Sequence, residues 1–175
     1  MVGTNTPKSK PTTVGVDTNV LLDLARDDET VLDCLATVRK RLPNVQFVVS
    51  HTVIQELADI ADNGDTAAER EAAMVALTKL VQEWNFTPFN CVPVGNGIVE
   101  ETGRKLRAKQ LLPETELNDS FVIVEAGLIG ATLLISSDRH IHEIDWQALK
   151  IELDAADIST PLISSPSKIV KNFFS

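Results

Sequence analysis

Four acidic residues occupy positions from which carboxylates can converge on a metal ion. Asp17 and Asp138 each follow a short apolar run typical of a buried strand, whereas Glu56 and Asp119 fall in the first turns of two predicted helices. Oxygen-only ligands suit hard cations such as Mg²⁺ and Mn²⁺. Such ions can stabilise the attacking and leaving oxygens of a phosphodiester displacement and activate a water molecule. The four acids therefore indicate metal-assisted hydrolysis as a chemistry open to this chain.

The helical spacing around Asp119 predicts that this acid faces the interior. Val122, Ile123 and Ala126 follow it by three, four and seven residues, so that Asp119 is the first member of an apolar stripe. Glu56 has a similar place in its helix. An inward-facing acid is costly unless a cation or a donor pairs with it, and several adjacent carboxylates raise one another's pKa. A divalent cation would relieve both costs.

The elements that must position these acids are predicted from periodicity. Short apolar runs that do not alternate are typical of strands buried on both faces, and helical patterns lie between them. We expect strands at Thr12–Val16, Val45–Val49 and Ala131–Ser136, with weaker strands at Phe86–Val94 and Pro161–Ile163. We expect helices at Asn19–Leu42 with an interruption near Asp27–Asp28, at Thr52–Asn63, Thr66–Trp84, Glu100–Leu112 and Thr115–Leu128, and after Ser165–Pro166. This order predicts a three-layer α/β fold, in which the carboxyl ends of the strands form the ligand-binding edge.

Composition limits the class of protein further. The chain has 175 residues and a hydrophobic fraction of 43%, which predicts one domain over residues 12–175 after a flexible tail over residues 1–11. No apolar run approaches the ~20 residues of a membrane span. Cys34 and Cys91 lack a CxxC spacing, and we expect two free thiols in a cytoplasmic protein. The net charge of −9 argues against a simple nucleic-acid binding module, which is usually basic.

Four segments together resemble the PIN-domain nucleases. They are VGVDTNVLLDL (Val14–Leu24), VVSHTVIQELADI (Val48–Ile60), ELNDSFVIVEAGLIGATLLISSD (Glu116–Asp138) and SPSKIVKNF (Ser165–Phe173). The resemblance implies a Rossmann-like fold with a central parallel sheet. It also implies cleavage of single-stranded RNA that depends on Mg²⁺ or Mn²⁺. Asp17, Glu56, Asp119 and Asp138 would be the catalytic metal ligands.

Several residues extend this hypothesis. Asn19 and Ser136 are candidates to orient a carboxylate or a water molecule, and Arg104, Lys105 and Arg107 are candidates to bind RNA phosphates. The sequence departs from the family where Glu125 replaces a residue that is usually small or neutral, and where the segment 62–112 is longer than in the compact toxin members. These departures bear on substrate and subfamily.

Alternatives remain open at this level. A phosphatase with Asp17 as nucleophile would usually carry a second Asp two residues later, where this chain has Asn19. A catalytically silent PIN-like domain that only binds RNA or acts as a scaffold is a second alternative. His140 and His142 could also bind zinc, although no third ligand of that kind is nearby. A homodimer and an antitoxin-type protein partner are compatible with the resemblance.

Overall fold

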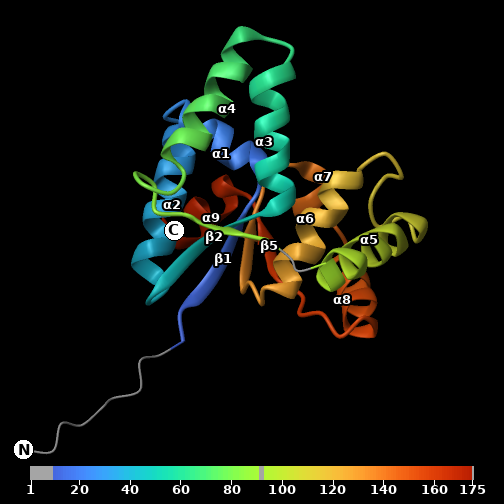
Figure 1. Cartoon of the computed structure of the whole chain (residues 1–175). Coiled ribbons are helices and arrows are strands. Elements are labelled where there is room, and N and C mark those ends of the chain that lie inside the picture. The colour runs from blue at the N-terminus through green and yellow to red at the C-terminus, as the bar shows by residue number, and fades with distance from the viewer. Residues whose placement is uncertain (1–9, 91–92, 175) are drawn as a thin grey trace, which may run out of the picture.

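A computed structural model of the chain describes residues 10–90 and 93–174, which form a parallel sheet flanked by helices (Figure 1). The sheet has five strands in the order β3-β2-β1-β4-β5, and every pair of neighbours is parallel. The strands are β1 (Thr12–Val16), β2 (Val45–Ser50), β3 (Thr87–Phe89), β4 (Leu133–Ile135) and β5 (Leu162–Ser164). The predicted α/β fold with a central parallel sheet is confirmed.

The strand register brings distant parts of the chain to one edge of the sheet. In the central strand β1, Gly15 pairs with Val48 of β2, and Val16 pairs with Ile135 of β4. Asp17 and Ser136 therefore follow directly on a pair of aligned residues. Because all strands run in the same direction, their carboxyl ends and the helix starts that follow them lie on this edge.

Nine helices are present in the described part of the chain. They are α1 (Thr18–Ala25), α2 (Glu29–Arg41), α3 (His51–Asn63), α4 (Ala67–Lys79), α5 (Pro93–Ala108), α6 (Leu117–Leu128), α7 (Arg139–His142), α8 (Trp146–Ala155) and α9 (Pro166–Phe174). In Figure 1, α2 and α9 lie on one side of the sheet and α5, α6 and α8 on the other. No helix here is long and apolar enough to cross a membrane.

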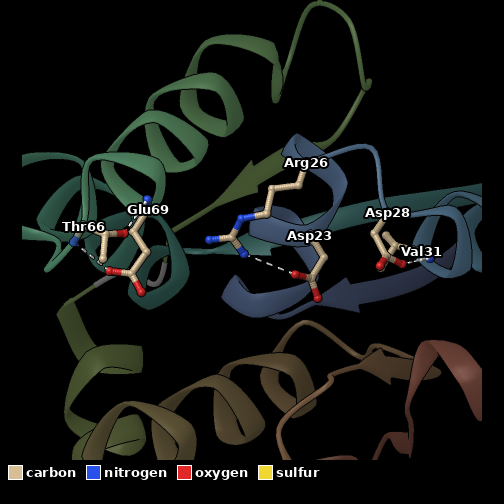
Figure 2. Close-up of polar contacts among 6 residues, drawn as sticks. All are labelled: Asp23, Arg26, Asp28, Val31, Thr66 and Glu69. Atoms are coloured by element: carbon tan, nitrogen blue, oxygen red, sulfur yellow. Dashed lines mark hydrogen bonds and ion pairs between the residues drawn. The ribbon is translucent and has the colours of Figure 1, made fainter.

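Side-chain caps fix several helix starts, and Figure 2 shows two of them. The Asp28 carboxylate accepts the Val31 N–H at 3.0 Å and so begins α2 after the predicted interruption. Thr66 and Glu69 form a reciprocal capping box at the start of α4, with distances of 3.1 and 3.3 Å. Each cap satisfies backbone donors that a helix start leaves unpaired.

The core lies on both sides of the sheet and is largely aliphatic. Val14, Leu134 and Ile135 of the central strands are at most 1% exposed. Helix α6 is buried along most of its length, and Ile123 and Val124 are inaccessible to solvent. The buried part of α6 begins at Ser120, directly after Asp119, so that Asp119 lies where the helix enters the core.

Some predicted boundaries differ from the structure. Helix α3 begins at His51 with Ser50 as its N-cap, not at Thr52, and α6 begins at Leu117 after Glu116, not after a Thr115 cap. Helix α5 begins at Pro93, before the predicted start at Glu100. The predicted strand Phe86–Val94 is confirmed only at Thr87–Phe89, and its residues 91–92 lie outside the described range, as do residues 1–9 of the predicted tail.

Candidate active site

Asp17 is a buried acid that directly follows the central strand β1, beside the end of β4. Its carboxylate caps α1, since Oδ1 accepts the Thr18 N–H at 2.7 Å, and Oδ2 accepts the Ser136 hydroxyl at 2.7 Å. Its own N–H donates to the Ile135 carbonyl at 3.0 Å, which extends the pairing of β1 with β4 by one residue. The side chain is accordingly fixed in direction, and the residue is only 3% exposed.

Ser136 connects Asp17 to Asp138. While the Ser136 hydroxyl donates to Asp17, the same oxygen accepts the backbone N–H of Asp138 at 3.0 Å. Asp138 Oδ1 in turn accepts the His140 N–H at 2.7 Å and caps the short helix α7. Ser136 is fully buried. Its hydroxyl joins the acids that follow β1 and β4, and its supporting role in a metal site stays a prediction.

Glu56 and Asp119 reach the same edge from α3 and α6, and both are half-buried. Burial, followed by the charge of Asp17, raises the pKa of Glu56 to about 6. Burial, followed by the charges of Asp17 and Asp138, raises the pKa of Asp119 to about 7. The pKa of Asp17 is raised as well, mainly by burial and further by Asp138, although Ser136 and Thr18 lower it. The charges of Asp17 and Asp138 therefore act on both Glu56 and Asp119.

No basic side chain neutralises this cluster among the residues that the structure describes. None of the ion pairs in residues 10–90 and 93–174 includes one of the four acids. The Asp119 Oδ2 atom is buried and has no hydrogen-bond partner in this part of the chain. Buried carboxylates in this state are unfavourable, and a hard cation with oxygen ligands would compensate for them.

The residues present fit a divalent cation by donor chemistry but do not form a preformed cage. Within the described residues, no three His, Cys, Asp or Glu side chains are arranged to hold a metal ion as they stand. The unpaired Asp119 Oδ2 and the raised pKa values are the features that favour a cation. His140 and His142 lie on α7 rather than on a strand, and they form no such group either.

The three predicted RNA-binding residues occupy different environments on α5. Arg104 and Lys105 are exposed and pair with Glu101 at 2.9 and 3.5 Å. Arg107 instead donates to the Ser120 hydroxyl of α6 and lies over the Phe121 ring, 5.9 Å from its centroid. Arg104 and Arg107 nevertheless line one cleft of about 910 Å³. Arg107 thus also holds α5 against the helix that carries Asp119.

Two other residues lie close to the acids in the sequence, and only one of them, Asn19, was predicted to support the site. Asn19 is exposed, and no hydrogen bond connects it to any of the four acids in the described part of the chain. Arg139, which the sequence analysis did not single out, follows Asp138 directly and is 81% exposed. With His140 it lines a cleft of about 550 Å³. Its position next to a predicted metal ligand was the signal that could have identified it.

Comparison with known proteins agrees with the fold of the chain. Residues 14–147 match the family model described as PIN domain. Three solved structures with a similar fold are VapBC2 from Rickettsia felis bound to a DNA fragment from its promoter, VapBC-1 from nontypeable Haemophilus influenzae, and FitAcB from Neisseria gonorrhoeae. A comparison with curated proteins gives no match.

The structural similarity extends over most of each chain at low sequence identity. For the Rickettsia chain the TM-score is 0.58 at 14% identity, covering 88% of this chain and 98% of that one. For the Haemophilus chain the TM-score is 0.56 at 15% identity, covering 89% of this chain and 99% of that one. For the Neisseria chain the TM-score is 0.52 at 17% identity, covering 87% of this chain and 97% of that one. At such identities the similarity concerns the fold.

Proposed function

This chain belongs to the PIN domain family, and we propose that it is a divalent-metal-dependent endoribonuclease that hydrolyses single-stranded RNA. The observation that carries the proposal is the convergence of Asp17, Glu56, Asp119 and Asp138 from four elements on one edge of the sheet, with no cation to pair with them among the described residues. Their mutual repulsion supports a site that is completed by Mg²⁺ or Mn²⁺.

In this proposal three of the acids would hold the metal ion, and Glu56 would have one of two tasks. Asp17 and Asp138, kept in place through Ser136, would hold the metal together with Asp119. When bound, Mg²⁺ or Mn²⁺ supplies charge stabilisation and lowers the pKa of a water molecule. Glu56 would either complete the ligand set or orient the attacking water by accepting a hydrogen bond from it. No covalent intermediate on the chain is needed, which separates this mechanism from that of an aspartate-based phosphatase.

Basic groups beside the acids would bind the RNA backbone. Arg104 and Lys105 are exposed on α5, and Arg139 is exposed on α7 next to Asp138. Arg104 and Lys105 pair with Glu101 of α5, and Arg139 pairs with Glu143, the C-cap of α7. Such surface pairs contribute little and can be exchanged for phosphate contacts. Binding of RNA would therefore weaken as the salt concentration rises.

A protein partner follows from the same family context. Three solved structures with a similar fold are VapBC2, VapBC-1 and FitAcB. We therefore include an antitoxin-type protein partner and a homodimer in the proposal. A cytoplasmic location is compatible with the free, buried thiol of Cys34.

Cleavage of a labelled single-stranded RNA in Mn²⁺, in Mg²⁺ and in EDTA tests the proposal. We expect cleavage in the metal ions only, and its loss in Asp17→Asn. Asp62→Asn, a change at an exposed acid of α3 remote from the four, serves as the matched control and should cleave normally. Cleavage that persists in EDTA or in Asp17→Asn would refute the proposed site. RNA binding without cleavage under all conditions would favour the silent alternative.

A further inference from the structure

A small polar pocket lies next to the acid cluster, between α3, α5 and α6. Its volume is about 230 Å³, and the lining side chains that matter here are His51, Thr52, Gln55, Asn96, Phe121 and Glu125. Thr52 precedes Glu56 by one helical turn, which places them ~5–6 Å apart on the same face of α3. Phe121 and Glu125 belong to α6, the helix whose first turn carries Asp119. The pocket therefore adjoins the proposed site of cleavage but shares none of its four acids.

The inner wall of this pocket contains Glu125, an acid that is not part of the proposed metal site. Glu125 is 4% exposed, and its Oε1 accepts the Thr52 hydroxyl at 2.5 Å. Its Oε2 has no hydrogen-bond partner, and no basic side chain pairs with it, among the residues that the structure describes. A buried acceptor that lacks a donor costs free energy, and a ligand that brings a donor into the pocket would recover it.

The outer wall offers further groups for recognition. The side chains of Gln55 and Asn96 are exposed, and like His51 they make no hydrogen bond within the described residues. Phe121 supplies an aromatic wall that is held in place, since the Arg107 guanidinium lies over its ring and α5 approaches it at Gly103. A Cβ atom at Gly103 would come within 2.9 Å of Phe121 Cδ1, so the absence of a side chain there permits this packing.

We propose that this pocket binds a nucleobase of the RNA strand, beside the scissile phosphate, and that it prefers guanine. The proposal rests on the proposed function for its substrate class. An aromatic wall with amide and carboxylate groups is the chemistry by which proteins recognise unstacked bases. Guanine carries adjacent N1–H and N2–H donors that a carboxylate can accept, whereas uracil offers a single ring N–H. The preference follows from the two oxygens of Glu125, because Oε2 is unpaired and Oε1 keeps a second lone pair beside the Thr52 hydroxyl.

Binding of nucleosides to the metal-free protein tests the pocket without cleavage. Guanosine and uridine are titrated in EDTA while the side-chain amide signals of Gln55 and Asn96 are followed by NMR. A bidentate contact discriminates by ~1–3 kcal/mol, so we expect guanosine to bind about five- to 150-fold more tightly than uridine. Equal shifts with both nucleosides, or no shift of these signals, would overturn the proposal. A shift with N-acetyl-arginine amide in place of guanosine would assign the pocket to a basic side chain of a protein partner, and would overturn it too.

Cleavage by variants separates this proposal from the proposed function. Glu125→Gln should lower the preference for RNA that contains guanosine over oligouridine by about tenfold, because a carboxylate acceptor becomes partly a donor. If that buried change prevents folding, the exposed changes Gln55→Ala and Asn96→Ala take its place. Gln82→Ala, at an exposed glutamine outside the pocket, is the matched control. If no form cleaves RNA, the proposed function fails and the nucleoside titration alone decides on the pocket. If RNA is cleaved but every variant keeps the preference of the unchanged protein, the pocket assignment alone fails.

Discussion

Replacing Asp119 by Asn should stabilise the metal-free protein at pH 8 and remove part of its pH dependence. The pKa of Asp119 is raised from 3.8 to about 7 in the folded chain by burial and by the neighbouring acids. Below pH ~4 this carboxyl is protonated in both the folded and the unfolded chain. Between pH ~4 and ~7 the folded chain retains a proton that the unfolded chain loses, so stability falls as the pH rises. Above pH ~7 the carboxyl is charged in both the folded and the unfolded chain, and the folded chain is destabilised by the full amount.

The magnitude follows from the size of this change in pKa. At roughly 1.36 kcal/mol per pKa unit, a rise from 3.8 to about 7 corresponds to about 4 kcal/mol. Asp119 is only half-buried and solvent screens part of the repulsion, so we expect about 2 kcal/mol from the neutral, isosteric Asn. The variant should have almost the same stability as the unchanged protein near pH 4.

Urea unfolding in EDTA at pH 4, 6 and 8 measures this effect. Asp62→Asn is a matched control, since Asp62 is an exposed acid and should change the stability by less than ~0.5 kcal/mol. The reasoning fails if Asp119→Asn is no more stable than the unchanged protein at pH 8. It also fails if the gain in stability is as large at pH 4 as at pH 8.

Three other predictions concern the hydrogen bonds of Ser136, the cap of α4 and the exposed basic residues of α5. Ser136→Ala removes the donor to Asp17 and the acceptor for the Asp138 N–H. We expect the free energy of unfolding in urea to fall by ~2 kcal/mol and the pKa of Asp17 to rise further. An unchanged stability would contradict this. Thr66→Ala removes the capping box of α4 and should cost ~1 kcal/mol with no effect on RNA cleavage. Arg104→Ala with Lys105→Ala should weaken binding to all single-stranded RNAs alike and reduce its salt dependence, measured by fluorescence anisotropy; a change confined to one sequence would argue against phosphate contacts.

The central part of the fold was predictable because its signals are local. The runs Thr12–Val16 and Val45–Val49 are short, apolar and not alternating, and they form β1 and β2. Asp27–Asp28 marked the break between α1 and α2 correctly, because Asp28 caps the second helix. The placement of Asp17 and Asp138 after strands follows from the runs Thr12–Val16 and Ala131–Ser136, whereas their connection through Ser136 needs the register of β4 against β1.

Other features depended on tertiary contacts that no single stretch of sequence contains. Ser50 and Thr52 are equally good caps by residue type, but the Thr52 hydroxyl is committed to Glu125, which lies 73 residues away, and Ser50 caps α3. Helix α8 was not predicted, although Asp145 caps it and Leu149 and Leu153 have helical spacing. Whether the four acids hold a metal ion is a question of side-chain arrangement that the sequence pattern leaves as a prediction.

Binding of Mn²⁺, measured by the loss of the free-ion EPR signal on the same samples used for RNA cleavage, tests the central claim most directly. The account predicts that the unchanged protein and Asp62→Asn bind Mn²⁺ and cleave RNA over the same range of metal concentration. Asp17→Asn and Asp119→Asn should remain folded but lose both activities. Equal Mn²⁺ binding by all four proteins, or RNA cleavage that does not follow Mn²⁺ occupancy, would contradict the assignment of these acids as the metal site of a ribonuclease.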